Sequence, residues 1–545
     1  MRETAGRLPE IIETILLRRG VDVADIASFL YPSLEDLAPP EDLPGVVEAA
    51  DVLLDAVSAN KRIVVFGDYD CDGVCAAAIV VKALETLGAR VQPFLPERLS
   101  EGYGMSDASV SRMLSEHPGV GLVVTVDNGI NAVDQIAALR EKGVSVVVTD
   151  HHLPGDRLPE VDALVDPKVA APPHLDDLCG AGVAFLLANR LVAEAKRRGM
   201  YSGPNVGGPL LVLAGIATVT DIMPLVGQNR IIVAEALKRF AAWAPLGLKE
   251  LYFRAARNGC DKLTSRDFGY LLGPRINAAG RLASGMDALD LILETNRERA
   301  REYALRIDLN NTERKSIEVK MTEEALDKVV PGASAQVIDL PDGHPGVAGI
   351  VAVRLLERLG GKVPVCVIAS GHGSARSPEG INIRDALVAC ADVLETYGGH
   401  AAAGGFSVKS GCVDDFRRRL CEYCSGLGAE VVSHSGEPPL WIEPGDVTLE
   451  LAESLQLLEP FGEGNEDPVF SLGGVYFSDV RALGSDGRHL ALQLRGSGLR
   501  AVWWGHGGLV ESLRASGASP HDISFTIAIS DYGERHAELR LVSID

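Results

Sequence analysis

The sequence of 545 residues has few cysteines, a deficit of positive charge and no long hydrophobic run. Its nine cysteines are scattered and odd in number, so they do not form a disulfide framework, and we expect a reducing, cytoplasmic setting. The one close pair, Cys421 and Cys424, lacks a second pair or histidines at the spacing of a zinc site. No stretch reaches the roughly 18 apolar residues of a membrane span, and the start shows no secretory signal.

Lysine and arginine number 52 against 75 acidic residues, which leaves a net charge of −23. This balance excludes a generally basic protein that coats nucleic acid. Any nucleic-acid site must be a local basic groove in an acidic body. A hydrophobic fraction of 46% and a mean hydropathy of +0.12 exclude a disordered chain.

Short apolar runs alternate with helix-like segments in the first half of the chain. Strands that alternate with helices are typical of a parallel sheet with helices on both faces, whose strands are buried on both sides. We therefore predict an α/β domain with a doubly wound parallel sheet. Its predicted strands are Arg62–Phe66, Val91–Leu95, Leu122–Val126 and Val144–Val148.

Changes in composition divide the chain into five predicted regions. Residues 298–328 are rich in good helix formers and predict a connecting helix. The last hundred residues hold short alternating runs that favour a small β-barrel, and residues 433–439 form a plausible linker before it. The regions are a helical lead-in (1–60), the doubly wound domain (61–235), a helical region ending in the connecting helix (236–332), a smaller α/β domain (333–430) and an OB-like β-barrel (440–545).

Three acidic clusters each come directly after a predicted strand of the first domain. They are Asp68 to Gly73, Asp127 to Gly129, and Asp150-His151-His152; a fourth acid, Asp221, ends an apolar stretch. In a doubly wound sheet ligands bind outside the carboxyl ends of the strands, so these clusters should meet in one crevice.

Several carboxylates in one place repel each other unless a cation neutralises them. Carboxylates with one or two imidazoles suit Mn²⁺ or Mg²⁺, and so many ligands favour two ions about 3.5–4 Å apart, the arrangement used for attack at phosphorus. Asp72 or Asp127 taken alone could equally be a helix N-cap or a turn residue. Three clusters in register, one with a double histidine, favour the metal interpretation.

These motifs also carry a family resemblance. DYDCDG, VDNG, DHH and ATVTDIMPL resemble the DHH phosphoesterase superfamily. Further segments resemble, in order along the chain, the RecJ exonuclease family: SFLYPSLEDLAPPEDLPG, GPRINAAGRL, LNNTERKSIE, GHPGVAGIVAVRL, GSARS, IRDAL, GGHAAAGGFS and EPFGEGNEDPVF. The resemblance implies a DHH domain, a connecting helix, a DHH-associated domain and an OB-fold, which is the organisation predicted above.

The same resemblance implies an activity: hydrolysis of single-stranded DNA from the 5′ end to mononucleotides, by two-metal-ion chemistry, in DNA repair and recombination. It implies two divalent cations, Mn²⁺ or Mg²⁺, with Asp127 bridging them. It gives His152 a place near the scissile phosphate, where a histidine packed in the core is the alternative, and Asp150 a role in orienting the histidines. The implied metal ligands are Asp68, Asp70, Asp72, Asp127, His151 and Asp221, and the implied catalytic residues are His152 and Asp127.

Substrate-binding roles follow from the resemblance as well, although each residue has a plain alternative as a solvated charge or a turn residue. Ser374 and Arg376 match a pocket for the terminal 5′-phosphate, with Ala375 in place of a frequent glycine. The others match positions beside the nucleic-acid path: Arg98, Tyr103, Arg275, Asn277, Arg281 and His400.

Two other classes of function stay open from the sequence. One is a DHH-family phosphodiesterase or phosphatase for short oligonucleotides or cyclic dinucleotides, and the other is a non-catalytic scaffold of a replication complex. The expected partners are single-stranded DNA and a single-strand-binding protein or a helicase, and we expect a monomer. The predicted barrel is acidic and has no lysine, so strong DNA binding is not expected from it; of the adjacent Trp503 and Trp504, one should be in the core.

Overall fold

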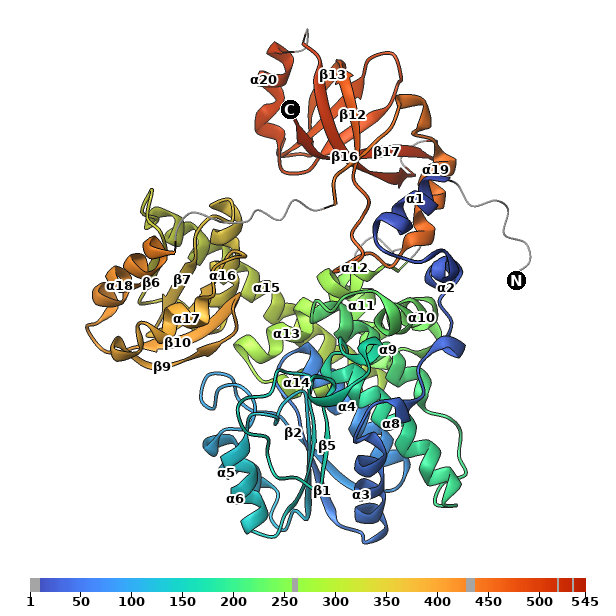
Figure 1. Ribbon diagram of the computed structural model, residues 1–545, viewed down its shortest axis with the longest axis vertical. Coiled ribbons are helices and arrows are strands. Elements are labelled where there is room, and N and C mark those ends of the chain that lie inside the picture. The colour runs from blue at the N-terminus through green and yellow to red at the C-terminus, as the bar shows by residue number, and fades with distance from the viewer. Residues whose placement is uncertain (1–9, 257–262, 428–436, 517–518, 532–533) are drawn as a thin grey trace.

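Figure 1 shows the computed structural model, which describes residues 10–256, 263–427, 437–516, 519–531 and 534–545. A parallel-sheet domain lies at the bottom, a second α/β domain at the left and a third domain at the top, with a layer of helices between them. Among the described residues, no helix is long and apolar enough to cross a membrane.

The first domain is built on five parallel strands in the order β2-β1-β3-β4-β5. This confirms the predicted doubly wound sheet. The central strands β1, β3 and β4 are mostly apolar because helices cover both faces of the sheet: α3, α4 and α8 on one, α5 and α6 on the other. The elements are β1 (Arg62–Phe66), β2 (Arg90–Phe94), β3 (Leu122–Val126), β4 (Ser145–Thr149), β5 (Ala163–Val165), α3 (Val46–Ser58), α4 (Cys71–Thr86), α5 (Asp107–Glu116), α6 (Val133–Glu141), α7 (Pro167–Ala170) and α8 (Gly180–Arg197).

A helical region follows the sheet and ends in the predicted connecting helix. That helix, α15, begins after Asn296, whose side chain accepts hydrogen bonds from the N–H groups of Glu298 and Arg299. The elements are α9 (Gly207–Thr220), α10 (Gly227–Trp243), α11 (Leu246–Ala255), α12 (Ser265–Asp267), a π-turn η5 (Phe268–Leu272), α13 (Gly273–Leu282), α14 (Gly285–Leu293) and α15 (Arg297–Asp327).

The second α/β domain has a mixed sheet in the order β6-β7-β8-β10-β9, in which only β6 and β7 are parallel. The helix α16 packs against β7 and β8 and also against α15, so it ties this domain to the helical region. The elements are β6 (Gln336–Leu340), α16 (Pro345–Arg358), β7 (Val365–Ala369), β8 (His372–Arg376), α17 (Ile383–Val388), β9 (Leu394–Gly399), β10 (Ala403–Val408) and α18 (Val413–Gly426).

The C-terminal domain is a seven-stranded sheet in the order β11-β12-β16-β17-β15-β14-β13. Trp503 is half-buried and packs against its core, whereas Trp504 is 55% exposed, so the two side chains face different surroundings, as predicted. Part of the predicted linker, residues 433–436, lies outside the described residues. The elements are β11 (Leu440–Trp441), α19 (Leu449–Leu455), β12 (Phe470–Val475), β13 (Phe477–Leu483), β14 (His489–Leu494), β15 (Arg500–Trp503), α20 (Val510–Ala515), β16 (His521–Ser530) and β17 (His536–Ile544).

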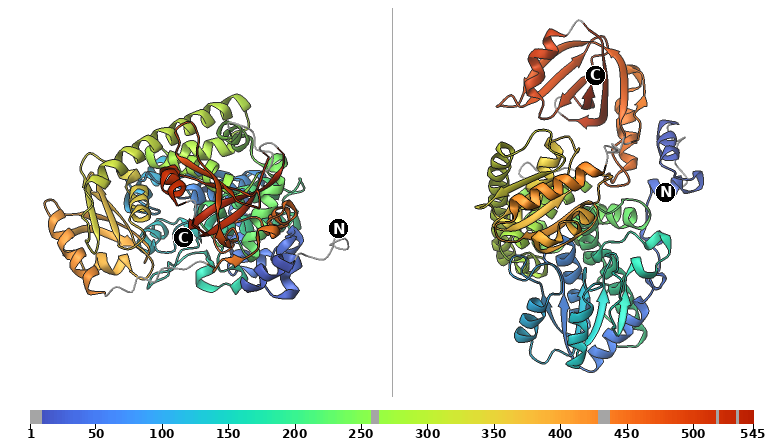
Figure 2. Two further views of the ribbon diagram at one scale, coloured as in Figure 1. Left: turned by 90° about the horizontal axis from the view of Figure 1, so that it is seen from above. Right: turned by 60° about the vertical axis from the view of Figure 1, so that its left-hand side comes forward.

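The N-terminal segment is shared between two domains. Helices α1 (Glu10–Arg18) and α2 (Ile26–Leu30) contribute Ile12, Ile15 and Leu30 to the core of the C-terminal domain, whereas α3 packs on the parallel sheet. Figure 2 shows α1 and α2 beside the segment that leads into the C-terminal domain. The predicted lead-in therefore does not pack as one unit, because its first helices bury their apolar faces against residues more than 400 positions away.

Candidate active site

The first acidic cluster lies between β1 and α4. Asp70 is the N-cap of α4, and its side chain accepts a hydrogen bond from the N–H of Gly73 at 3.0 Å. Asp68 is fully buried; its Oδ1 accepts from the N–H of Gly104 at 3.2 Å, and its Oδ2 has no partner among the described residues. One acid of the cluster thus caps the helix, while another leaves an unsatisfied carboxylate oxygen in the interior.

The N-terminus of α8 packs against the acids from the side. Asp72 is held by the N–H groups of Gly180 and Ala181, both at 2.7 Å, where the helix dipole favours a negative charge. A Cβ on Gly180 would lie 2.6 Å from the Cβ of Asp127, so only glycine lets the helix approach this closely. Asp127 itself has a φ of 60°, a left-handed conformation that Asp and Asn tolerate better than other residues with side chains.

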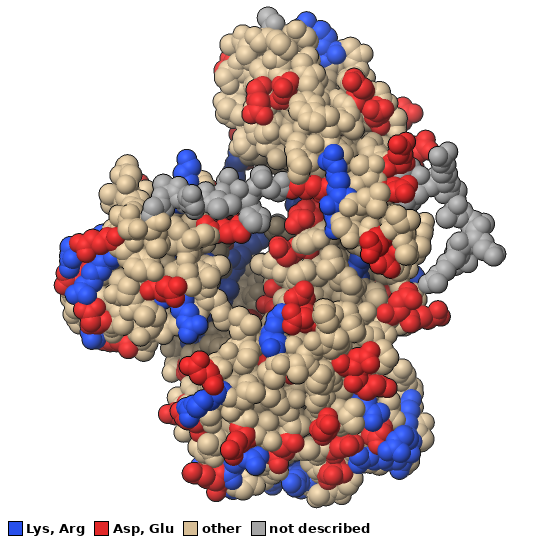
Figure 3. Space-filling view, in the orientation of Figure 1, with Lys and Arg blue, Asp and Glu red and all other residues tan. Residues whose placement is uncertain are grey.

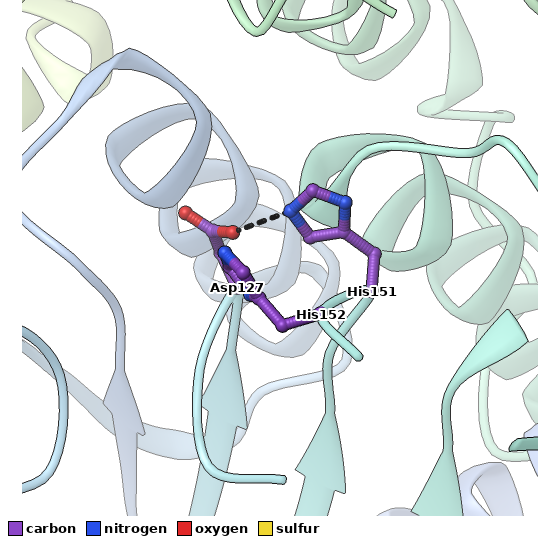
Figure 4. A group of neighbouring side chains, drawn as sticks. All are labelled: Asp127, His151 and His152. Carbon is purple, nitrogen blue, oxygen red and sulfur yellow. Dashed lines mark hydrogen bonds and ion pairs between the residues drawn. The ribbon is translucent and has the colours of Figure 1, made fainter. Parts of the chain in front are cut away.

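His151 lies at the centre of the carboxylates. Its Nε2 is 3.1 Å from Asp127 Oδ1, 3.6 Å from Asp72 Oδ2 and 3.7 Å from Asp221 Oδ2. Figure 4 shows Asp127 and the two histidines, which come from the ends of neighbouring strands. Two groups of ligand atoms result, each within 4.8 Å: Asp127 with His151 and His152, and Asp72 with His151 and Asp221.

Asp150 orients the double histidine. Its carboxylate accepts from Nδ1 of His152 at 2.7 Å, from the N–H of His151 at 2.8 Å and from the N–H of Ile130 at 2.9 Å. This is the geometry of the supporting role expected for Asp150. The Tyr103 hydroxyl lies 3.1 Å from Nε2 of His152 and donates to the backbone oxygen of Asp127 at 3.0 Å, so it links the two clusters.

The pKa values record the crowding of like charges. Burial, reinforced by neighbouring carboxylates, raises the pKa of Asp68 and of Asp127 well above the ordinary value and that of Asp221 to about 8. Burial opposes protonation of His152, but the hydrogen bond and charge of Asp150 outweigh it and raise the pKa of His152 to about 9. Burial lowers the pKa of His151, which keeps that imidazole neutral and able to bind a metal.

The donor set fits divalent cations of the Mn²⁺ or Mg²⁺ type. It consists of carboxylate oxygens and imidazole nitrogens, and the orphaned oxygen of Asp68 together with the raised pKa values shows that the acids lack a counter-charge. Asp72, Asp127, His151 and Asp221 belong to the two compact groups. Asp68 and Asp70 lie outside them, and His152, expected near the phosphate, lies within one.

Arg98 lies near two further arginines, Arg281 and Arg376, and also near Asp68 of the first acidic cluster. The charge of Arg98 lowers the pKa of both Arg281 and Arg376, after burial as the first cause, and the pKa of Arg281 falls to about 9. Ser374 and Arg376 point at the bare backbone of α16: a Cβ on Gly349 would lie 3.5 Å from Ser374 Oγ and 3.1 Å from an Arg376 guanidinium nitrogen. We call Arg98, Arg281, Ser374 and Arg376 the arginine cluster.

The other predicted substrate contacts are placed differently. Arg275 is buried, with its Nε 2.9 Å from Asp308 Oδ1 on α15, so this guanidinium braces two helices and its placement disfavours the predicted contact with nucleic acid. Asn277 accepts from the N–H of Cys71 at 2.7 Å and so positions the first acidic loop. His400 lies near enough to His152 for that charge to lower its pKa, after burial as the first cause.

Sequence reasoning missed the support that α8 gives to Asp72. Any residue type except proline can supply a backbone N–H donor, so the sequence does not reveal these contacts. The glycine in Cys179-Gly180-Ala181 is nevertheless a signal of close packing. Asp166 lies near the double histidine, since the charges of Asp150 and His152 act on it; it caps α7 through the N–H of Lys168 at 2.8 Å, and burial raises its pKa to about 7.

Comparison with known proteins places this architecture in a class. Residues 62–215 match the N-terminal domain of the DHH family, residues 332–426 the DHHA1 domain and residues 440–542 the RecJ OB domain. The fold and the carboxylate–histidine centre therefore define a DHH-family protein with an associated DHHA1 domain and a C-terminal OB domain.

The sequence relatives are more specific. The chain is 38% identical to the single-stranded-DNA-specific exonuclease RecJ of Thermus thermophilus, over 87% of this chain and 68% of that protein. It is 34% identical to the RecJ of Escherichia coli, over 90% of this chain and 87% of that protein. The chain belongs to the RecJ family of single-stranded-DNA-specific exonucleases. It spans 64% of the length of the Bacillus subtilis RecJ, to which it is 34% identical.

Solved structures agree with this assignment. The crystal structure of Thermus thermophilus RecJ in complex with Mn²⁺ matches with a TM-score of 0.83 at 34% identity, over 99% of this chain and 76% of that one. The Mg²⁺ complex of the same protein matches with a TM-score of 0.78 at 32% identity, over 98% of this chain and 74% of that one. The fold is therefore one that has been solved with either metal.

Proposed function

We propose that this protein degrades single-stranded DNA from the 5′ end to mononucleotides, with two divalent cations, Mn²⁺ or Mg²⁺, in its active site. The observation that carries the proposal is that a carboxylate–histidine centre has a half-buried arginine cluster beside it, near enough for Arg98 to act on Asp68 and Asp70 on Arg281. The first suits cations and the second suits the phosphates of a nucleic acid. A single-strand-binding protein or a helicase as partner, and a monomeric state, rest on the family resemblance alone.

The metal centre is proposed to consist of Asp70, Asp72, Asp127, His151 and Asp221, with Asp127 as the bridging ligand and Asp68 supporting the loop. Bound there, the cations would supply an activated water and neutralise charge on the phosphorus oxygens. His152, with Nδ1 held by Asp150, keeps its proton and directs Nε2 toward Tyr103 at the open side of the centre. The proton on Nε2 of His152 can be donated to a phosphate oxygen.

The arginine cluster is proposed to hold the terminal 5′-phosphate. A terminal phosphate carries more charge than an internal diester and exposes more acceptor oxygens, so a guanidinium and a hydroxyl favour it. Such an anion would relieve the repulsion that Arg98 exerts on Arg281 and on Arg376. With the end held, the neighbouring diester lies at the metal centre, which explains cutting by single nucleotides.

The test is degradation of end-labelled oligonucleotides of 2, about 10 and about 50 nucleotides in Mn²⁺, in Mg²⁺ and in EDTA. We expect metal-dependent release of mononucleotides from the 5′ end of the longer strands. Hydrolysis of the dinucleotide alone would favour the small-substrate phosphodiesterase considered from the sequence. Binding without hydrolysis in any metal would favour a scaffold.

A further inference from the structure

A groove of about 510 Å³ leads away from the arginine cluster between three helices. Each helix contributes one face to it: η5 and α13 from one side, α15 from below and α16 from the other side. Figure 3 shows Lys and Arg side chains in the hollow between the second α/β domain and the rest of the molecule. The groove residues used below are Tyr270, Asn277, Arg281, Arg314, Lys315 and Arg354.

The spacing along η5 and α13 sets the direction of the groove. Tyr270, Asn277 and Arg281 are separated by seven and four positions, the spacing of residues on one helix face. Arg281 belongs to the arginine cluster, and the charge of Asp70 in the proposed metal centre acts on it. Asn277 accepts from the N–H of Cys71 beside that acid, so the groove begins next to the proposed cleavage site. Tyr270 lies about 16 Å further along the helix, from a rise of about 1.5 Å per residue. For a strand stacked as in B-DNA, with about 3.4 Å per nucleotide, that distance spans about five nucleotides.

The groove is positively charged although the protein is acidic. Its single lining carboxylate, Glu318, is taken up by Arg314 at 2.6 Å and Arg354 at 3.0 Å. Lys315 is exposed and, in the part of the chain that the structure describes, has no hydrogen bond or ion pair. Burial, followed by the charges of Arg275 and Arg314, lowers the pKa of Lys315, and the nearby charges of Glu318 and Asp308 only partly oppose this.

Tyr270 gives the groove an aromatic platform at its outer end. Its side chain is 70% exposed, and the guanidinium of Arg266 lies 5.5 Å from the centre of its ring. A single exposed aromatic is ordinary on a protein surface, and Phe253 on α11, 82% exposed and outside this groove, is an example. Tyr270 differs because it lines a groove with a net positive charge, which includes Lys315, unpaired among the described residues. Aromatic rings beside a basic track are how proteins hold single strands without reading sequence.

We propose that Tyr270 stacks on a base of the unpaired strand several nucleotides downstream of the cleavage site, while Lys315 and Arg354 contact its phosphates. The inference rests on the proposed function, because it takes the 5′ end to be held at the arginine cluster. A base that stacks on a side chain must have left its duplex, so this contact would also favour single strands. Tyr270 lies about 16 Å along the helix from Arg281. It is therefore a positioning residue, which acts through substrate binding.

The experiment compares Tyr270→Ala with Phe253→Ala as the matched control, on 5′-phosphorylated strands of 3 and 20 nucleotides in Mn²⁺. We expect Tyr270→Ala to raise KM for the 20-mer roughly 5- to 150-fold, as for loss of one stacked base, with kcat little changed. The trinucleotide should be cut as by wild type, because it does not reach Tyr270. Tyr270→Trp should restore binding of the 20-mer.

Binding is measured separately, by fluorescence anisotropy of the labelled 20-mer in EDTA. A drop in affinity for Tyr270→Ala supports the inference even if wild type fails to hydrolyse the strand, a failure that would count against the proposed function alone. Lys315→Ala should reduce the slope of log K against log salt by about 0.7. Tyr270→Ala that binds and cuts like Phe253→Ala, or that impairs the trinucleotide equally, would overturn the inference.

Discussion

The metal centre and the arginine cluster are two neighbouring groups of like charge, with opposite signs. In the first, carboxylates have raised pKa values, that of Asp221 reaching about 8. In the second, the pKa of Arg281 falls to about 9. The two groups are close enough to influence each other, since the charge of Arg98 acts to lower the pKa of Asp68. Among the described residues, however, they form no ion pair with each other.

The absence of ion pairs between these carboxylates and guanidinium groups leaves both groups free to bind ligands. Unpaired charges that are removed from water raise the free energy of the folded protein unless ligands neutralise them. Ion pairs between the two groups would have lowered that free energy. Backbone contacts hold them apart instead: Asp72 is fixed by α8, and Arg281 donates to the backbone oxygen of Gly346 at 3.1 Å. Cations on one side and a phosphate chain on the other would complete both at once.

The largest expected effect is at the shared ligand of the metal centre. Loss of a residue that only supports a metal ligand costs up to about 100-fold in activity. Asp127→Asn should lower turnover by more than that, because it removes the charge of the proposed bridging ligand itself. Asn is chosen over Ala because it tolerates the left-handed backbone at this position. Turnover in Mn²⁺ and calorimetric Mn²⁺ binding are the measurements. Near-wild-type turnover would remove Asp127 from the bridging role.

The matched control for that variant is Asp134→Ala, whose side chain is 82% exposed on α6. It should leave turnover unchanged. The metal-free Asp127→Asn protein should unfold no earlier than wild type, since the substitution relieves repulsion among the buried acids.

A smaller effect is expected at the arginine cluster. Arg376→Ala should slow cleavage of a 5′-phosphorylated strand roughly 10- to 100-fold, from the loss of charge-assisted hydrogen bonds, and affect a 5′-hydroxyl strand much less. The ratio of kcat/KM on the two strands is the measurement. Arg358→Ala, at the exposed far end of α16, is the control. Equal losses on both strands would mean that the terminal phosphate is bound elsewhere.

The smallest effect concerns stability without metal. The folded state raises the pKa of Asp221 to about 8, so it holds a proton that the unfolded chain has lost above about pH 4. Stability therefore falls as pH rises from 4 to 8, and His152, with its pKa raised to about 9, adds a loss in the same direction. We expect the Tm of EDTA-treated protein to decline by a few degrees from pH 5 to pH 8.

Saturating Mn²⁺ should abolish that decline and raise the Tm at pH 8, because a ligand bound only to the folded state stabilises it by about 2.7 kcal/mol at 100 times its Kd. Asp127→Asn should lose most of this rise. A flat profile in EDTA would contradict the crowding of uncompensated acids. The acids of the metal centre would then already be neutralised within the protein, and the comparison with the arginine cluster would fail.

Much of the metal centre was predictable because its geometry is generic. Each acidic cluster follows an apolar run, and parallel strands that end together bring their following loops together. The strands Arg62–Phe66 and Leu122–Val126 were predicted with their observed bounds, and the connecting helix within one residue. The supporting role of Asp150 was implied by the family resemblance, and its hydrogen bonds to His151 and His152 have the geometry for it. Domain boundaries and individual site roles stay predictions.

What the sequence determined by itself is local: which runs become strands, which acids follow them, and which family the motifs resemble. Only the tertiary structure decided the rest, because it depends on contacts between distant segments. It brought Arg376 to Arg98, turned Arg275 onto Asp308, set α1 in the core of the C-terminal domain, and left Tyr270 exposed beside Lys315. Periodicity tells which face of an element is apolar, but it does not tell which other element covers that face.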